Sequence, residues 1–575
     1  LKATNWLTLT YRAALSMNEL NVKGTSKGET PSLYAQTLRS FTVVPGFSNE
    51  QARRTSRLSS EFIANVQKTF NDFRLNVIAG QYFRHSDYSE SRVGAGNLVV
   101  PEVFNVSNRT GELSGSNETR RSRLFGLYGT VGVSYKGWAN VEFSGRNDWT
   151  SVLAKNNNSY FYPGVSGSLV LSDALTAVKN SSVVSYLKLR ASWQKIGNTD
   201  LNPYSLDATY SQINGFPFGS IPGFSADDAA YDPNLKPEFT TSKEVGFEIG
   251  FLKNRLNFEV AFYQQDNTDQ IIPILVSDAT GYTSSNVNAA SFTNRGIELD
   301  LKLTPLIKFR NGSIDIKANA SYNTSEVNKI FDNLDRIRIA SGFGNAANYA
   351  VIGQPAFVLL ANDYARDELG RVIVDRASGL PTQDPNLKQF GRTLPLWIIG
   401  LNPSIEWKGI QLSAVAEYKG GHYAYNQIGS DMAWTGISKA SAANHRERFV
   451  FPNSVYDDGT GKYVPNTDIA VSAVNTFYTG VYREATSNFI TSAAAWRIRE
   501  VALGYSIPKK LLGKQQLVKA VTVALNARNL ALFLPSSNEY TDPDFNNTIG
   551  NSSGINTSKI QPPTRLYGAN VTITF

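Results

Sequence analysis

The chain has 575 residues, 41% hydrophobic content, no cysteine, three histidines and a formal net charge of +8. The lack of cysteine excludes disulfides and thiolate metal sites, and so few histidines argue against a His-rich metal centre. Basic residues are scattered instead of gathered on one element, so no nucleic-acid partner is expected.

Strand patterns with a period of two residues recur along the whole chain. Two polar stretches, to about residue 56 and over 85–121, are expected to be connections. No apolar run reaches the roughly 18 residues of a membrane helix, so a membrane protein of this sequence must be a barrel. The predicted strands lie near 7–13, 62–66, 73–79, 125–135, 139–143, 160–172, 186–194, 243–252, 255–265, 294–304, 313–323, 396–407, 410–419, 495–506, 518–530 and 566–575.

The clearest hairpin is predicted over 244–263, with its turn at Lys253-Asn254. One face carries large apolar side chains, and the other carries charged or very small ones. The register places Glu248 opposite Glu259, and two facing carboxylates are destabilising on a dry surface, so that face is expected to be wet and its charge offset by Lys or Arg. An apolar-out, polar-in ribbon is what a transmembrane β-barrel needs, although a soluble sandwich also alternates.

Loop lengths favour the barrel over the sandwich. Short connections, such as Lys408-Gly409 and the link from Pro508 to Gln516, alternate with long ones over roughly 195–242, 324–395, 420–494 and 531–565. Short turns at one end and long loops at the other are the outer-membrane pattern. The sequence therefore predicts an all-β, antiparallel up-and-down barrel domain with about 16 strands in this chain.

Five sequence blocks in order resemble one transporter family. The blocks are Gly145-Arg146-Asn147-Asp148-Trp149 with Ser159-Tyr160-Phe161-Tyr162-Pro163, Leu187-Lys188-Leu189-Arg190-Ala191-Ser192-Trp193, Leu235-Lys236-Pro237-Glu238, Asp269-Gln270-Ile271-Ile272-Pro273 with Asn294-Arg295-Gly296-Ile297-Glu298-Leu299, and Trp496-Arg497-Ile498-Arg499-Glu500-Val501-Ala502-Leu503-Gly504-Tyr505 with Ala527-Arg528-Asn529-Leu530. Together they resemble the SusC/RagA family of TonB-dependent outer-membrane transporters of Bacteroidetes.

The resemblance implies a barrel of about 22 strands with a plug in its lumen. Residues 1–575 are then the C-terminal part of the barrel domain, and the plug, about six strands and the TonB-contacting segment are expected to be absent from this sequence. It further implies a Gram-negative outer-membrane location, a SusD-like lipoprotein partner, energy from TonB-ExbB-ExbD, and import of oligosaccharides or peptides. The alternatives are a passive porin of about 16 strands, which would pair 1–15 with 566–575, and a barrel-anchored adhesion protein.

The long 420–494 loop carries the candidate substrate-binding residues. Flat aromatic faces beside amides suit sugar rings or peptide side chains, although packing of the loops on one another is the simpler explanation. No catalytic set, metal site or cofactor motif is found, so no enzyme is predicted; Asp457-Asp458-Gly459-Thr460-Gly461 is expected to be a hairpin turn. The binding candidates are Tyr423, Tyr425, Asn426, Trp434, Tyr478 and Tyr482.

Overall fold

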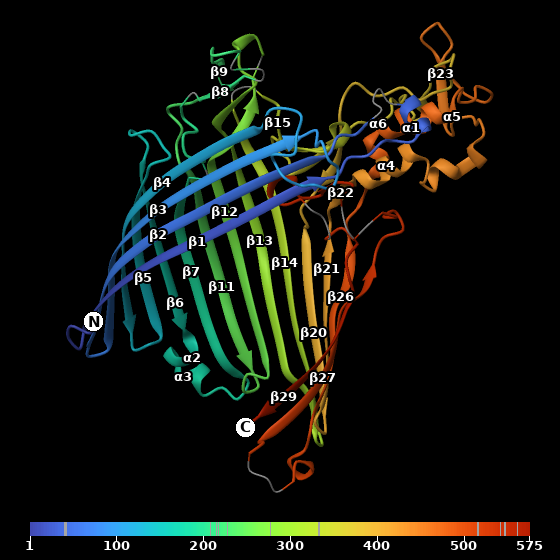
Figure 1. Ribbon diagram of the computed structural model, residues 1–575. Coiled ribbons are helices and arrows are strands. Elements are labelled where there is room, and N and C mark those ends of the chain that lie inside the picture. Colours follow the sequence, from blue (N-terminus) through green and yellow to red (C-terminus); the bar gives the residue numbers. More distant parts are fainter. Residues whose placement is uncertain are drawn as a thin grey trace. The chain divides into compact units, whose positions relative to one another are not determined.

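The computed structural model is mostly β (Figure 1), and its chain divides into two compact units. Unit 1 comprises 1–166, 194–239 and 275–288, and unit 2 comprises 167–193, 240–274 and 289–575. The structure describes all residues except 39–42, 200, 208, 214, 215, 217, 227, 277, 332, 333, 514–516, 541, 545–547, 560 and 561.

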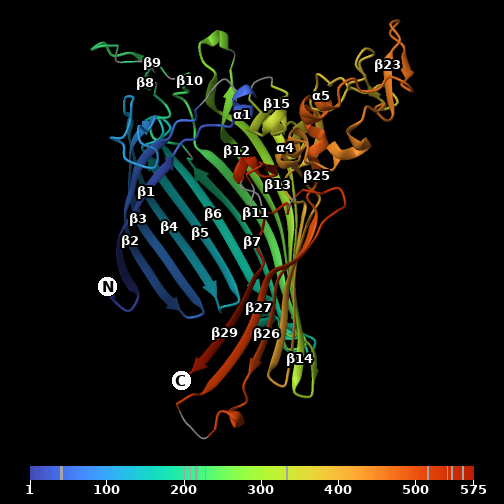
Figure 2. The ribbon, with the colours of Figure 1, turned by 45° about the vertical axis from the view of Figure 1, so that its right-hand side comes forward.

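Unit 1 is built on an antiparallel sheet of consecutive strands, each paired with the next (Figure 2). The turn between β4 and β5 has positive φ at both Lys136 and Gly137, the backbone that a tight hairpin with the right twist requires. The strands are β1 (Leu7–Ser26), β2 (Phe47–Phe70), β3 (Phe73–Gly96), β4 (Ser114–Tyr135) and β5 (Ala139–Thr150).

The first four strands run far into the stretches that were expected to be loops. β1 pairs with β2 from Leu7 opposite Val66 as far as Ser26 opposite Phe47. In these extensions charged side chains replace the apolar ones, and cross-strand ion pairs join them: Arg53 Nε lies 2.9 Å from Glu90 Oε2, and Arg121 Nε lies 3.0 Å from Asp87 Oδ1. Only the apolar half of each strand was therefore visible as a pattern in the sequence.

The other elements that begin before residue 238, or lie in unit 1, are short or cross the unit boundaries. β10 pairs in parallel with the start of β13, and β8 pairs with β9. These short or boundary-crossing elements are α1 (Leu33–Leu38), β6 (Ser159–Val170), α2 (Leu171–Ala174), α3 (Thr176–Lys179), β7 (Val184–Asn198), β8 (Tyr210–Gln212), β9 (Phe224–Ala226), β10 (Ala229–Ala230) and η1 (Asp278–Thr280).

Unit 2 contains a second run of long antiparallel strands, in the order β13, β14, β20, β21, β26, β27 and β29. Only Lys408 and Gly409 join β20 to β21; both have positive φ, and a Cβ on Gly409 would lie 2.9 Å from the main-chain O of Ser506. The strands of this unit are β11 (Glu238–Phe251), β12 (Leu256–Leu275), β13 (Ser284–Phe309), β14 (Gly312–Ile330), β20 (Trp397–Trp407), β21 (Ile410–Gly420), β26 (Ala495–Ser506), β27 (Ala520–Phe533) and β29 (Leu566–Thr574).

Each of the predicted strands is present, so the prediction of a mostly β, antiparallel chain with about 16 long strands is confirmed. One face of these strands exposes a belt of large apolar side chains. Val245, in the hairpin expected to be apolar on one side, is 61% exposed, and Leu525 in β27 is 56% exposed. A soluble sandwich would bury this face; a surface that meets lipid leaves it open. Among the described residues, every helix is too short or too polar to span a bilayer.

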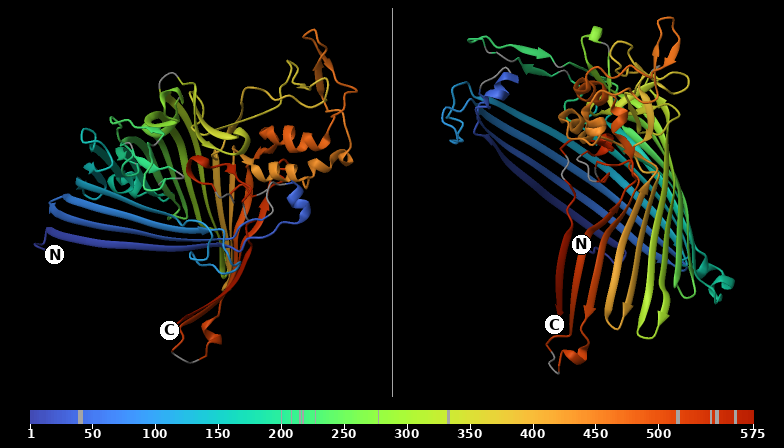
Figure 3. Two further views of the ribbon diagram at one scale, coloured as in Figure 1. Left: turned by 45° about the horizontal axis from the view of Figure 1, so that its top comes forward. Right: turned by 90° about the vertical axis from the view of Figure 1, so that its right-hand side faces the viewer.

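The buried core of unit 2 lies in its loops. We call residues 342–395, 421–494 and the described residues between 534 and 557 the loop cluster; its helices within 421–494, coloured orange, lie together near the ends of β20 and β21 (Figure 1 and Figure 3). Short strands of the loop cluster pair with one another in small sheets. Its elements, with the neighbouring β15, are β15 (Arg336–Ser341), η2 (Phe343–Asn345), β16 (Ala347–Val351), β17 (Val358–Ala361), β18 (Val372–Ile373), β19 (Lys388–Arg392), β22 (Tyr423–Asn426), α4 (Gln427–Thr435), η3 (Ala440–Arg446), β23 (Ser454–Asp457), β24 (Tyr463–Pro465), α5 (Val474–Thr476), η4 (Phe477–Val481), α6 (Tyr482–Glu484), η5 (Thr486–Phe489), β25 (Ile490–Ser492), η7 (Gly550–Ser552) and β28 (Ile555–Asn556). The remaining element, η6 (Lys509–Leu511), lies in the connection from β26 to β27, at the ends of these strands away from the loop cluster.

Candidate binding site in the loop cluster

A network of ion pairs, which we call the ion-pair knot, connects the loop cluster to β21 and β26. Arg497, only 3% exposed, donates from Nη2 to Asp542 Oδ1 at 2.6 Å, and its Nη1 lies 3.5 Å from Asp544 Oδ2. Asp544 also accepts from Lys419 at 3.0 Å and pairs with Arg499. Burial alone would raise the pKa of Asp544, but Arg497 and Lys419 more than offset it, so the pKa is lowered and the carboxylate stays charged.

β22 forms the centre of the cluster. It pairs with β25 on one side and with β28 on the other, and Tyr425 N donates to the main-chain O of Gly554 at 2.9 Å. The Asn426 amide donates to Thr491 Oγ1 and accepts from Asn556 Nδ2, both at 3.0 Å. Tyr425 itself is fully buried, packed with Phe489 and Ile555. Two of the six predicted binding residues therefore lie inside the core of the cluster in this conformation.

A chain of aromatic contacts connects the next two candidates to that core. Tyr478 packs edge-on against Phe477, with ring centroids 4.8 Å apart, and against Tyr482 at 5.4 Å. Tyr482 meets Phe489 at 5.5 Å. Tyr478 Oη donates to the main-chain O of Ala440 at 2.7 Å, and burial raises the pKa of Tyr482 to about 12. Both phenols stay neutral, and both rings hold the loops together here.

The last two candidates are open to solvent. Tyr423 is 41% exposed and Trp434 is 53% exposed. The Arg483 guanidinium lies over the Trp434 ring, 5.5 Å from its centroid, and Arg483 Nη2 lies 3.4 Å from Asp431 Oδ1. An exposed indole backed by a cation offers a flat face to a ligand. Of the six candidates, these two are the ones whose rings a ligand can reach without moving the cluster.

His422 lies beside the knot, next to the exposed Tyr423. The side chain is buried, its Nδ1 has no hydrogen-bond partner among the described residues, and burial lowers its pKa to about 4. The imidazole is therefore neutral at physiological pH. Sequence reasoning gave it no role and missed Arg497, Asp542 and Asp544 as a unit; the alternation of Arg497 and Arg499 in β26 was the one signal available.

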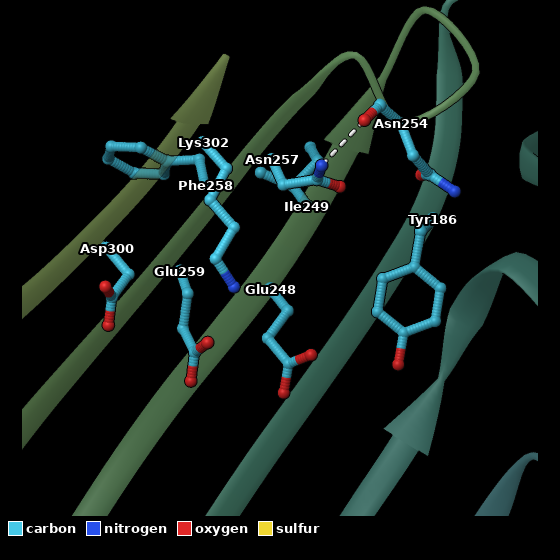
Figure 4. Close-up of a pocket in the computed structure, with 9 residues that line it drawn as sticks. All are labelled: Tyr186, Glu248, Ile249, Asn254, Asn257, Phe258, Glu259, Asp300 and Lys302. Atoms are coloured by element: carbon cyan, nitrogen blue, oxygen red, sulfur yellow. Dashed lines mark hydrogen bonds between the residues drawn. The ribbon is translucent and has the colours of Figure 1, made fainter. Parts of the chain in front are cut away.

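The polar face of the β7–β11–β12 region carries a second set of ion pairs, of which Figure 4 shows Glu248 and Glu259. Arg190 Nη1 donates to Glu259 Oε1 at 2.6 Å and to Glu248 Oε1 at 3.2 Å, and Lys188 Nζ donates to Glu248 at 2.9 Å. These carboxylates border a cavity of about 280 Å³ into which Asp300 and Lys302 also face. The expected facing pair is confirmed, and so is its neutralisation by Lys and Arg.

The predicted hairpin turn is present, and an ion pair with a buried carboxylate lies in β5. Asp457 Oδ1 accepts the main-chain N–H groups of Gly459 and Gly461, which makes 457–461 a hairpin turn between β23 and β24. Arg146 Nε donates to Asp148 Oδ1 at 2.8 Å, and Tyr162 Oη donates to Asp148 Oδ2 at 2.6 Å. Within the described part of the chain, no three potential metal ligands gather in one place.

Known proteins resemble this chain in both sequence and fold. The family described as "TonB dependent receptor-like, beta-barrel" matches residues 2–530. TonB-dependent receptor P3 of Formosa agariphila is 22% identical over 90% of this chain and 51% of its own length. TonB-dependent receptor SusC of Bacteroides thetaiotaomicron is 23% identical over 83% of this chain and 46% of its own length. The structure of the RagAB peptide transporter superposes with a TM-score of 0.75 at 18% identity, covering all of this chain and 60% of that one.

The chain spans about half the length of these relatives. The family match extends over almost every strand described above, and the superposition shows a common fold. The superposition covers the whole chain, the loop cluster included.

Proposed function

Because this chain belongs to the TonB-dependent receptor-like β-barrel family of Gram-negative outer membranes, we propose that it is the barrel portion of a TonB-energised importer. The family consists of transport proteins, not enzymes. We infer an oligosaccharide or peptide as the cargo and a SusD-like surface lipoprotein as the partner. The remaining strands, the plug and the segment that contacts TonB-ExbB-ExbD are proposed to belong to the other half of a longer protein.

The loop cluster is the observation that carries this proposal. It is a folded body with its own core, fixed to the strand ends by the Arg497 knot, and it presents Tyr423 and Trp434 outward. Rigidly positioned loops are where barrels hold their binding residues. A capture site on rigid loops fits an importer of solutes too large for a passive pore.

Strand pairing at the two chain ends tests the importer against the porin. The chain has no native cysteine, so engineered pairs report without background. Cysteines at Leu9 or Tyr11, combined with cysteines at Ala569 or Val571, are expected to remain uncrosslinked in the outer membrane, because other strands of the complete barrel separate β1 from β29. Efficient crosslinking, together with ion conductance by this chain alone, would establish the porin instead.

Uptake tests the transport step itself. Cells that carry the complete protein are expected to accumulate a labelled oligosaccharide or peptide only when the inner membrane is energised. Trp434→Ala is expected to lower that uptake without lowering the amount of folded protein. The matched substitution Trp407→Ala, at a strand end in the apolar belt, should leave uptake unchanged. Uptake that survives dissipation of the proton-motive force would count against energised import.

A further inference from the structure

A second cavity of about 450 Å³ lies in unit 2, where the loop cluster meets the polar face of β12, β13 and β14. Its lining includes neutral polar groups, among them the amides of Asn294 and Asn323, and apolar groups, among them Phe357 and Ile398. Arg392, at the end of β19, borders the same space.

Arg392 differs from the other half-buried cations of this unit in having no acidic partner. Its Nη1 donates to the main-chain O of Asn323 and its Nη2 to Thr324 Oγ1, both at 3.1 Å. Among the described residues, no carboxylate oxygen lies within 4.0 Å of it. Burial lowers the pKa of Arg392, which shows that its environment disfavours the charge. A guanidinium has five N–H donors, so three remain for another group.

The paired cations show what is missing. Arg190 has three carboxylates around it, Arg497 has Asp542 and Asp544, and Lys419 has Asp544 and Glu417. A buried charge without a partner is costly, and a planar guanidinium matches a carboxylate in a two-pronged geometry. The partner that Arg392 lacks within the described chain can therefore come from a ligand in the cavity.

We propose that Arg392 forms a carboxylate-binding subsite, and that its ligand is a peptide with a free carboxylate beside an apolar side chain. This rests on the proposed function as an importer and narrows its cargo. The amides of Asn294 and Asn323 suit the peptide backbone, while Phe357 and Ile398 suit an apolar side chain next to the charge. A neutral oligosaccharide carries no anion and would leave the charge of Arg392 without a partner.

The test compares two peptide pools on the complete protein in detergent. Both are N-acetylated hexapeptides that end in leucine and are otherwise random but free of Asp and Glu; one pool ends in a free carboxylate and the other in a carboxamide. Wild-type protein is expected to bind the carboxylate pool roughly tenfold to a hundredfold more tightly, the range for charge-assisted hydrogen bonds. Arg392→Gln is expected to abolish that preference while leaving carboxamide binding within about twofold of wild type.

Matched variants separate a ligand contact from a structural role. Arg371→Gln alters an arginine that is already paired with Asp367, at 2.7 Å, so the preference should remain. Arg392→Lys keeps the charge but loses the planar guanidinium that can bind a carboxylate through two N–H groups. It should therefore retain part of the preference for the carboxylate pool. Equal weakening of both pools by Arg392→Gln would show that the side chain only supports β14, and would overturn the proposal.

Two further outcomes are decisive. Binding of oligogalacturonate but of neither peptide pool would overturn the peptide assignment, and so would a wild-type protein that binds both pools equally. These measurements need no energised membrane, so they can fail while energised uptake still succeeds. Loss of uptake with the carboxylate preference intact would contradict the importer and leave the subsite standing.

Discussion

The strand region and the loop cluster use apolar side chains in opposite ways. In the strands, Val245, Phe143 and Leu525 point outward and stay more than half exposed. In the loop cluster, Tyr425, Phe489 and Ile555 are almost completely buried against one another. The chain therefore has a core where sequence patterns indicate loops, and an open apolar surface where they indicate strands. This inversion follows from the solvent, because lipid covers one region and water surrounds the other.

Removing the same side chain from the two regions should give the sharpest contrast. Phe489→Ala is expected to destabilise the loop cluster by about 3–5 kcal/mol, because it leaves a cavity among buried rings. Phe143→Ala in β5 leaves no cavity and should cost only the loss of contact with lipid. Limited proteolysis of intact cells should cut the cluster in the first variant and spare it in the second. Equal cutting in both would contradict a separate loop core.

The knot is expected to matter almost as much. Arg497→Ala leaves Asp542 without its 2.6 Å partner and should cost about 3–5 kcal/mol, as breaking a buried ion pair does. Arg528→Ala removes an exposed partner of Glu500 and should cost at most about 1 kcal/mol. Hydrogen exchange of residues 534–540 measures the difference; indistinguishable exchange in the two variants would show that the cluster does not depend on the knot.

The face assignment of the strands predicts an asymmetric effect at neighbouring positions. Phe258→Arg puts a charge on the belt and should impair membrane insertion by roughly 2–4 kcal/mol near the midplane. Asn257 shares one face of β12 with Glu259, two residues further on, so Asn257→Arg should be tolerated. Folded protein in outer-membrane fractions is the readout. Similar losses for the two variants would remove the basis for distinguishing a lipid face from a wet face.

The smallest effect is expected from pH. His422 has a folded pKa of about 4, below its ordinary 6.5, so the unfolded chain takes up the proton first. The contribution of the neutral His422 to the free energy of unfolding is therefore complete above pH 6.5. It is lost as the pH falls towards 4, by at most about 3 kcal/mol. Asp544, Lys419 and Arg497 face it. His422→Leu should reduce the drop in thermal stability between pH 7.5 and pH 5; an unchanged drop would assign it to other groups.

Local periodicity was enough to predict the strands but not the cluster. The Glu244–Tyr263 hairpin and the Lys408-Gly409 turn can each be predicted from a short stretch of sequence. Tyr425 is buried because Ile555, 130 positions away, lies beside it, and no local pattern records that contact. Similarly, Arg392 looks like any loop arginine in the sequence, and only the folded chain shows the cavity beside it. The six binding candidates were chosen by residue type, which does not distinguish the exposed Trp434 from the buried Asn426.

The lengths of β2 and β3 have a consequence for the cell surface. Each has 24 residues, whereas a tilted strand crosses the hydrocarbon in about 9–11. At roughly 3.3 Å per residue, more than 30 Å of each hairpin arm is left over beyond the oily layer. Antibodies, phages and host proteases that approach the bacterium would then meet these rigid, ion-paired strand extensions before they reach the lipid.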